Sequence, residues 1–458
     1  GMSAAISEAK NQMLSPVQYG EIAKTDQQNN VFRIYAKYEQ LLRGVGALDF
    51  DDLLLKAVKL FDEQKDALVK WQDRLTHVFV DEWQDTNKIQ YRLTKHIVGN
   101  NENITAVGDA AQSIYGWRGA DHRNINYLMK DFDKIKVINL ERNYRSTQNI
   151  LSAANSVIRK NTTHPILELW TEKENGEKLK IYRARSGLDE ASYIVNEVNS
   201  LVDKGYGYKD VAVLYRTNAQ SRVLEEALLH SGIPYTLVGG LRFYERAEIK
   251  DVISYLRLLV NARDTISEER EKKLGKRRFR KFKEYQERIG SVEDKSTLDI
   301  LDAVLSKTYY LKKYARETEE NLQRLENIKE LRSVATEFSN IHEFLENVAL
   351  VETEQDESGT IKILGEAEGK VTLMTLHAAK GLEFPVIFIV GMEEGLFPHS
   401  RSLYDIDELE EERRLFFVGI TRAKQGLFLS RVRYRTYRGQ LLRTISSQFL
   451  NELGLDVP

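Results

Sequence analysis

The chain has 458 residues, 42% of them hydrophobic and 30% charged, which is typical of a globular protein and is long enough for about three domains. Because the net charge is −2, a strongly basic protein is excluded, and any surface that binds nucleic acid must be a local patch. The chain contains no cysteine, which excludes disulfides and thiolate metal sites and fits a reducing, cytoplasmic setting; no apolar run approaches the roughly 18 residues of a membrane span.

The first part of the chain is predicted to be helical up to about residue 45. Apolar residues recur there at helical spacing, as at Val31 and Ile34. Asp49 is suited to cap the next helix, because its side chain can accept a hydrogen bond from a backbone N–H of the first turn. We favour capping over a metal site for the acids at 49–52, since no histidine or further carboxylate cluster lies nearby.

A short apolar run, Val78–Val80, is predicted to be a buried strand that ends directly in two carboxylates, Asp81 and Glu82. In a phosphate-loop motor, one acid in this position faces a magnesium ion and the next accepts the proton of the attacking water. Successive residues of a strand point to opposite sides, so the two acids need different partners. The alternative is a surface turn with solvated acids; we favour the motor because the next motif follows at the expected distance.

A second strand, Ile104–Val107, is expected to lead into a turn that contains Gln112, Tyr115, Trp117 and Arg118. A glutamine at a strand end can sense a γ-phosphate. The aromatic rings can stack on the bases of a single strand, and the arginine can hold them. The alternative is a packing loop whose tryptophan belongs to the core, and the loop taken alone favours that alternative.

A third strand is predicted at Ile135–Leu140, followed by residues suited to bind a nucleotide. Arg145, at the entry of a helix, is a good phosphate ligand, and Tyr144 offers a ring for an adenine. Ser146 or Thr147 is predicted to cap that helix. The alternative for Arg145 is a surface ion pair.

Between residues 180 and 260, strand-like and helix-like segments alternate, which predicts a parallel sheet. The predicted strands are Lys180–Tyr182, Val211–Tyr215 and Ile233–Val238, and the predicted helices are Ser221–His230 and Glu248–Val260.

From about 263 to 368, only helices are expected. They are placed at Leu298–Leu305, Leu322–Phe338 and Ile341–Val351. The segment 270–283 is the most basic of the chain and contains Phe279 and Phe282; contact with a phosphate backbone and a solvated linker or helix face are both open for it. Residues 352–370 are acidic, contain glycine and are predicted to form a mobile loop.

The strand pattern then returns. Strands are predicted at Val371–Leu376, Val386–Val390 and Leu427–Leu429, with a helix over Glu410–Phe417. An α/β pattern that is interrupted by helices and then resumed indicates one domain inserted into another.

Five motifs resemble those of the UvrD/Rep/PcrA group of superfamily 1 DNA helicases, in the family's order and over most of the chain. The matching strings are Asp81–Asp85, Gly108–Ala120, Asn143–Thr147, Thr375–Phe384 and Val418–Ala423. The resemblance implies an α/β protein with two RecA-like P-loop NTPase motor domains, ATP and Mg²⁺ between them, and 3′-to-5′ movement on single-stranded DNA. It also implies single-strand/duplex junctions as substrates and repair or replication proteins as partners.

Carried over to this chain, the resemblance implies five segments. They are the end of a helical insertion (1–45), the remainder of the first motor domain (46–143), the first part of the second motor domain (144–262), a shortened inserted helical domain (263–368) and the second part of the second motor domain (369–458).

The resemblance also implies roles for residues of the motifs. The catalytic residues would be Glu82 as general base, Gln112 as γ-phosphate sensor, and Arg145 and Arg422 as arginine fingers. An arginine finger raises the rate of hydrolysis about 10³–10⁵-fold. Asp81 would hold Mg²⁺ through water. The nucleotide would contact Tyr144, Gly381 and Glu383, and the DNA path would be lined by Tyr115, Trp117, Arg118, Thr375 and His377.

The chain departs from the family pattern in three ways. It contains no Gly-Lys-Ser or Gly-Lys-Thr, so the phosphate loop is absent; we expect the chain to begin inside the helical insertion of the first motor domain and to hydrolyse ATP weakly or not at all. The inserted helical domain is short and lacks the Arg-Gly-Ile-Gly stretch that members use near duplex DNA. Ala111 stands where the family often has an acid.

Two other interpretations stay open. The chain could be an ATPase-deficient module that grips single-stranded DNA or completes a partner. It could also be the motor part of a recombination helicase-nuclease, although no nuclease carboxylate cluster is found. Together, Glu82, Gln112, Arg145 and Arg422 favour a catalytic ancestry, because binding alone needs none of them.

Overall fold

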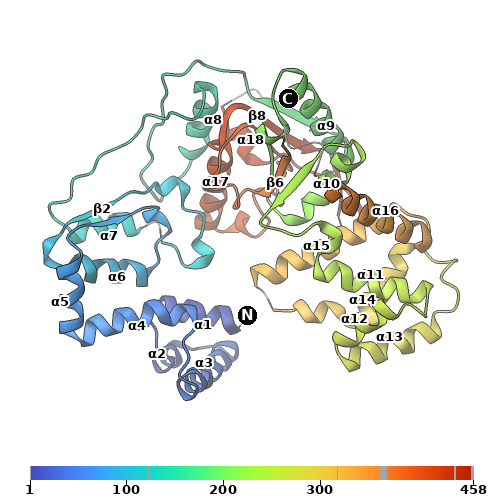
Figure 1. Cartoon of the computed structure of the whole chain (residues 1–458), viewed down its shortest axis with the longest axis horizontal. Helices are drawn as coiled ribbons and strands as arrows, with labels where there is room; N and C mark the ends of the chain where they lie inside the picture. The colour runs from blue at the N-terminus through green and yellow to red at the C-terminus, as the bar shows by residue number, and fades with distance from the viewer. Residues whose placement is uncertain (1, 122, 317, 361–368, 438–439, 455–458) are drawn as a thin grey trace. The chain divides into compact units, whose positions relative to one another are not determined.

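The computed structural model describes residues 2–121, 123–316, 318–360, 369–437 and 440–454 (Figure 1). The chain divides into two compact units. Unit 1 comprises Gly1–Glu141, Ile158–Glu168 and Glu410–Phe417; unit 2 comprises Arg142–Val157, Leu169–Leu409 and Val418–Pro458. Among the described residues, no helix has the length and apolar character needed to span a membrane.

Unit 1 begins with five helices, as predicted. They are α1 (Met2–Asn11), α2 (Pro16–Ile22), α3 (Asp26–Gly44), α4 (Phe50–Glu63) and α5 (Lys65–Arg74). Asp49 caps α4, because its Oδ1 accepts a hydrogen bond of 2.8 Å from the backbone N–H of Asp52. The capping prediction is therefore confirmed. Asp49 also accepts a hydrogen bond of 2.7 Å from the buried ammonium of Lys10, which ties α1 to the start of α4.

Two parallel strands form the sheet of unit 1, with helices α6 (Lys88–Val98) and α7 (Asn124–Asp131) beside them in the sequence. The strands are β1 (Val78–Val80) and β2 (Ile104–Ala106), and Val78 is in register with Ile104. A small apolar core holds them, formed by Trp83, Val98, Leu128 and Phe132 with partly buried neighbours. Because the strands are parallel, both of their carboxyl ends lie at the same edge of the sheet.

The predicted third strand at Ile135–Leu140 is wrong, since these residues have no regular secondary structure. Ile135 packs against the core of unit 1, but Val137, Ile138 and Leu140 have exposed fractions of 63%, 67% and 73%. A strand needs a neighbour for its backbone N–H and C=O groups, and no described strand pairs with this segment. The apolar character of residues 135–140 is therefore not sufficient for a strand to form.

Unit 2 contains a six-stranded parallel sheet, as the alternating pattern predicted. Its strand order is β3-β8-β7-β4-β6-β5. The strands are β3 (Lys180–Ala184), β4 (Val211–Tyr215), β5 (Tyr235–Val238), β6 (Val371–Thr375), β7 (Phe384–Ile389) and β8 (Ala423–Val432). All five residues of the central strand β4 are buried, as expected for a parallel sheet covered on both faces. The mixed α/β fold class is thus confirmed.

Helices and a hairpin complete the α/β part of unit 2. The helices are α8 (Gln148–Ile158), α9 (Gly187–Asp203), α10 (Ser221–His230), α17 (Ile406–Ile420), which contributes residues to both units, and α18 (Gln448–Glu452). The hairpin pairs β9 (Tyr434–Tyr437) with β10 (Gln440–Arg443) in antiparallel fashion. Sequence reasoning missed this hairpin, because arginines and polar residues interrupt its apolar alternation.

Six further helices of unit 2 pack around a separate apolar core (Figure 1). They are α11 (Ala247–Val260), α12 (Thr265–Lys273), α13 (Lys276–Arg288), α14 (Thr297–Lys307), α15 (Glu319–Ala335) and α16 (Ile341–Thr360). The predicted loop 352–370 is wrong up to Thr360, where α16 continues, and its residues 361–368 lie outside the described part of the chain.

The basic segment 270–283 forms the end of α12 and most of α13, which agrees with the helix-face alternative. Phe282 is fully buried in the helical core and is therefore not available to a nucleic acid. Phe279 lies between two lysines, with Lys272 Nζ 5.7 Å and Lys283 Nζ 5.6 Å from its ring centre. One lysine of α12 and one of α13 thus flank the ring of Phe279.

Glu271, on α12, is a fully buried acid that lies beside the hydroxyl of Tyr255. Burial, with Asp251 acting in the same direction, raises the pKa of Glu271 to about 8. Because this pKa is higher in the folded than in the unfolded chain, the protonated Glu271 stabilises the fold. This contribution to stability is complete below the unfolded-state pKa and is lost as the pH rises through about 8.

Glu271→Gln is therefore expected to leave stability unchanged near pH 5 and to stabilise the protein by about 2–4 kcal/mol near pH 8. Urea-induced unfolding followed by circular dichroism at the two pH values measures this difference. An equal stability difference at both pH values would show that Glu271 does not titrate in this range.

Candidate functional site

The paired acids of unit 1 lie directly after the carboxyl end of β1 and are both exposed. The backbone N–H of Glu82 donates a hydrogen bond of 2.8 Å to Asp81 Oδ1. Glu82 has a φ of +51°, in the left-handed region that non-glycine residues rarely adopt. Such strained residues are concentrated at functional sites, which is consistent with a role for this turn.

Two residues that sequence reasoning missed connect the acid pair to the glutamine of the next motif. Gln84 is 1% exposed; its Nε2 donates to Glu82 Oε2 at 2.5 Å, and its Oε1 accepts from the backbone N–H of Asp109 at 2.9 Å. Asp109 Oδ2 in turn accepts from Gln112 Nε2 at 2.9 Å. Glu82 and Gln112 therefore belong to one chain of hydrogen bonds, so that movement of one side chain can shift the other.

The backbone before Asp109 comes very close to this chain of hydrogen bonds. A Cβ atom on Gly108 would lie 2.8 Å from Gln84 Oε1 and 3.0 Å from Trp83 Cβ. Any larger residue at position 108 would therefore push Gln84 out of place. This requirement explains the glycine of the motif in physical terms.

The aromatic turn of unit 1 is held by residues from a distant part of the sequence. Arg414 Nε donates to the carbonyl of Ser113 at 2.7 Å, and Glu411 Oε1 accepts from the backbone N–H of Gly116 at 3.1 Å. The rings of Tyr115 and Trp117 meet edge to face with centres 6.4 Å apart, and Trp117 is 53% exposed.

The alternative that Trp117 packs in the core is therefore not observed, and its role on a DNA path stays a prediction. Arg118 belongs to the same 3₁₀ turn, but its side chain lies outside the described part of the structure.

In unit 2, Arg145 and Glu383 come together at the amino end of β7. Arg145 Nε lies 2.5 Å from Glu383 Oε2, and Lys424 Nζ lies 2.7 Å from Glu383 Oε1. The hydrogen bonds from Lys424 and then from Arg145 lower the pKa of Glu383 to about 2, so this acid is ionised at neutral pH. Lys424, adjacent to the last motif, was missed by sequence reasoning.

Arg422 lies near the same turns but is 3% exposed. Its Nε donates to the carbonyl of Val418 at 3.1 Å and its Nη1 to the carbonyl of Leu382 at 3.4 Å. Arg145 Nη1 donates to the carbonyl of Thr421 at 3.2 Å. The structure thus brings the two predicted arginine fingers and Glu383 into one part of unit 2.

The predicted cap of α8 is wrong in its detail. Ser146 Oγ donates to the carbonyl of Ala423 at 2.6 Å, and Thr147 Oγ1 is buried without a hydrogen-bond partner, so neither caps the helix. Asn143 Oδ1 instead accepts from the backbone N–H groups of Arg145 and Ser146, at 2.9 and 2.8 Å. The asparagine of the motif therefore shapes the turn that presents Arg145.

Tyr144 is 72% exposed, which leaves its ring accessible to a base. The guanidinium of Arg142 lies 4.9 Å from the centre of this ring and 5.7 Å from that of Trp170. The guanidinium of Arg142 thus orients the ring of Tyr144 and also contacts Trp170. Neither Arg142 nor Trp170 was predicted from the sequence.

The remaining predicted residues lie around the segment between β6 and β7. Thr375 ends β6, where its Oγ1 accepts from the backbone N–H of Ala378 at 3.2 Å, and His377 follows two residues later. Gly381 has a φ of +84°, which favours glycine at this turn. Because β6 and β7 are parallel, Thr375 and His377 lie at the carboxyl edge of the sheet and Glu383 at its amino edge.

Comparison with known proteins agrees with the motifs. The sequence model of the UvrD/REP helicase N-terminal domain matches residues 1–133, and that of the UvrD-like helicase C-terminal domain matches residues 138–309 and 268–434.

Curated relatives named ATP-dependent DNA helicase PcrA align with nearly the whole chain. The protein of Leuconostoc citreum is 38% identical over 98% of this chain and 66% of its own length. Those of Bacillus subtilis (strain 168) and Staphylococcus aureus (strain Mu50) are each 39% identical, over 99% and 98% of this chain and 68% and 67% of their own lengths. The chain thus spans about two thirds of the length of these relatives. With both domain families matched in order, the chain belongs to the UvrD-like helicases, a family of enzymes, as its five motifs predicted.

Proposed function

We propose that the chain carries the motor residues of an ATP-dependent DNA helicase that moves 3′-to-5′ along single-stranded DNA, with RecA-like motor domains and Mg²⁺ as the metal. The observation that carries the proposal is the hydrogen-bonded chain from Glu82 through Gln84 and Asp109 to Gln112. It joins an acid pair suited to metal-assisted hydrolysis to a glutamine suited to sense the γ-phosphate. Simple DNA binding requires no such connection.

In this proposal the two adjacent acids of unit 1 have different roles. Asp81 faces Mg²⁺ through water, and Glu82 accepts the proton of the attacking water. Both carboxylates are exposed, and so are open to a metal ion and to water. Gln112 releases its hydrogen bond to Asp109 and donates to the γ-phosphate instead. The loss of this hydrogen bond then changes the positions of Gln84 and of the aromatic turn.

Unit 2 supplies positive charge. Arg145 donates two hydrogen bonds within unit 2, from Nε to the carboxylate of Glu383 and from Nη1 to the carbonyl of Thr421. Among the described residues nothing accepts from its Nη2, which can therefore donate to a phosphate oxygen. The paired Glu383 keeps Arg145 in place before the nucleotide binds, so that little side-chain entropy is lost on binding.

The 458 residues contain no phosphate-loop lysine, so we propose that this chain alone hydrolyses ATP weakly or not at all. The test compares ATP hydrolysis, with and without single-stranded DNA, by the chain alone and by the chain joined to a strand and phosphate loop from a relative. We expect DNA-stimulated hydrolysis only in the joined protein. Rapid hydrolysis by the chain alone would contradict the proposal of impaired hydrolysis.

The second candidate is an ATPase-deficient module that binds single-stranded DNA or a partner. The observation in its favour is the same missing phosphate loop. If the joined protein binds DNA but still does not hydrolyse ATP, this second candidate replaces the first. Junctions of single strand and duplex as substrates, repair or replication proteins as partners and a cytoplasmic location are part of the proposal by family likeness.

Trp117→Ala is expected to weaken binding of single-stranded DNA by about 1–3 kcal/mol, because an exposed ring that stacks on a base is lost. Trp117→Phe should recover most of that affinity. Fluorescence anisotropy with a labelled oligothymidylate measures both.

Trp71→Ala is the matched control for this loss, since Trp71 is 43% exposed in the same unit but lies outside the motifs. If Trp117→Ala and Trp71→Ala bind DNA equally well, the aromatic turn is not part of the DNA path.

A further inference from the structure

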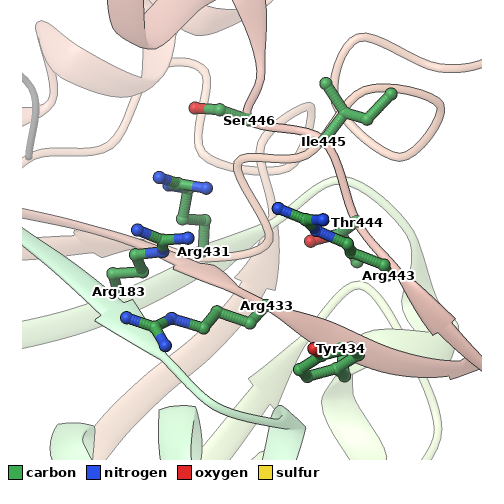
Figure 2. Close-up of a pocket in the computed structure, with 8 residues that line it drawn as sticks. All are labelled: Arg183, Arg431, Arg433, Tyr434, Arg443, Thr444, Ile445 and Ser446. Atoms are coloured by element: carbon green, nitrogen blue, oxygen red, sulfur yellow. The ribbon is translucent and has the colours of Figure 1, made fainter.

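Four arginines from separate parts of unit 2 converge on one cavity (Figure 2). The cavity has a volume of about 520 Å³, and we call it the arginine cavity. It is lined by Arg183, Arg431, Arg433, Tyr434, Arg443, Thr444, Ile445 and Ser446. Neither the helicase motifs nor the proposed function uses any of these residues.

The parallel sheet places two of these arginines side by side. Arg183 of β3 is in register with Arg431 of β8, and neighbours in register on parallel strands point to the same face. Figure 2 shows their guanidinium groups close together, with that of Arg443 facing the same space from the hairpin. The base of the hairpin is fixed to the sheet, because the backbone N–H of Arg433 donates to the carbonyl of Ala184 at 2.9 Å and its carbonyl accepts from Thr444 at 3.0 Å.

Nothing that lines the cavity compensates this positive charge, since no carboxylate is among the lining residues. In the part of the chain that the structure describes, Arg183, Arg433 and Arg443 form no ion pair with an acid. Arg435, the next arginine along the chain, differs: its guanidinium lies 2.7 Å from Glu393 and 3.2 Å from Glu190. The half-buried Arg435 is therefore paired with two acids, whereas Arg183, Arg433 and Arg443 of the cavity are not paired with any described acid.

The positive charges of the cavity repel one another. Burial and the nearby charges of Arg183 and Arg433 lower the pKa of Arg431, while Glu393 acts in the opposite direction. An anion between the arginines would relieve this repulsion. Ser446 adds a buried hydroxyl with no hydrogen-bond partner, which can donate to an anionic oxygen.

Within unit 2, the arginine cavity lies far from Arg145 and Glu383, which are proposed to contact ATP. Lys424 and Arg431 both belong to β8 and are seven positions apart, which corresponds to roughly 23 Å at about 3.3 Å per residue. Lys424 pairs with Glu383 at the amino edge of the sheet, whereas Arg431 is at its carboxyl edge. One nucleotide cannot reach both places.

We propose that the arginine cavity binds a ligand that carries several phosphate groups. Guanidinium groups donate paired hydrogen bonds that match phosphate oxygens, and several of them around one cavity favour a polyanion over a single small ion. Two sources share this chemistry, a free polyphosphate and the phosphodiester backbone of a nucleic-acid strand. The proposal does not depend on ATP hydrolysis, because binding alone tests it.

The test uses the whole chain and two double variants that remove the same charge. Arg183→Gln with Arg443→Gln removes two exposed arginines of the cavity, and Arg263→Gln with Arg316→Gln removes two exposed arginines elsewhere in unit 2. Calorimetric titration with tripolyphosphate, without metal, should show binding that the cavity variant weakens about tenfold or more and the control variant leaves unchanged. No binding by the unaltered chain, or equal weakening by both variants, would overturn the proposal.

A second arm identifies the source. Affinity for a short oligothymidylate is measured at several salt concentrations for the same three proteins. If the cavity holds a strand backbone, the slope of log affinity against log salt falls in magnitude by about 1.4 in the cavity variant, about 0.7 for each lost phosphate contact. If tripolyphosphate binding is weakened but this slope is unchanged, the ligand is a free polyphosphate. Circular dichroism of the variants confirms that they are folded.

Discussion

Lys10→Met is expected to destabilise unit 1 by about 3–5 kcal/mol, the loss typical of breaking a buried ion cluster. Lys10 is fully buried, and its Nζ lies 2.7 Å from Asp49, 2.8 Å from Glu39 and 2.9 Å from Asp52. Burial alone would lower the pKa of Lys10, but the hydrogen bonds to these three acids outweigh it and raise that pKa above its ordinary value. Without the ammonium, the buried carboxylates of Glu39 and Asp52 and the half-buried one of Asp49 would lose their counter-charge.

Urea-induced unfolding followed by tryptophan fluorescence measures this loss, because Trp83 is buried in the core of unit 1. Lys24→Met is the matched control at an exposed position, where a change below about 0.5 kcal/mol is expected. If Lys10→Met is as stable as Lys24→Met, the cluster does not hold α1, α3 and α4 together.

Glu82→Gln is expected to lower DNA-stimulated ATP hydrolysis by about 10²–10⁴-fold in the chain joined to a phosphate-loop segment. The amide keeps the size of the side chain and its place beside Gln84, but it cannot accept a proton from the attacking water. Nucleotide affinity should change little, because the proposed role of Glu82 is in the chemical step.

The matched control is Glu63→Gln, an exposed acid of the same unit that lies outside the motifs. Its rate of hydrolysis should equal that of the unaltered joined protein. A Glu82→Gln protein that hydrolyses ATP as fast as the control would show that Glu82 is not the general base, whatever the family likeness implies.

The central strands of unit 2 were predictable because they are short apolar runs bounded by polar residues, as at Val211–Tyr215 and Val386–Val390. The run Ile135–Leu140 looked the same in the sequence but forms no strand. What differs is the presence of a neighbouring strand, which the run itself does not encode. The hairpin β9–β10 was missed for the opposite reason, since backbone pairing forms it although polar residues such as Arg435 and Arg443 interrupt the apolar pattern.

The motif residues themselves were predictable, because their chemistry is local to each string. The residues that hold them in place were not. Gln84 reaches Asp109 across the sheet, Glu411 and Arg414 support a turn some three hundred residues earlier in the sequence, and Lys424 completes the pair of Arg145 and Glu383. Only the folded chain shows these contacts, since no spacing rule connects positions so far apart.

The central proposal is that Gln112 and Arg145 are both motor residues that act on bound ATP. Affinity for a fluorescent ATP analogue, measured in the joined protein for Gln112→Ala, Arg145→Gln and the double variant, tests it most directly. We expect each substitution to weaken binding and the two losses not to be additive, with a coupling of about 0.5–3 kcal/mol. Loss of affinity from only one of the two substitutions would contradict it.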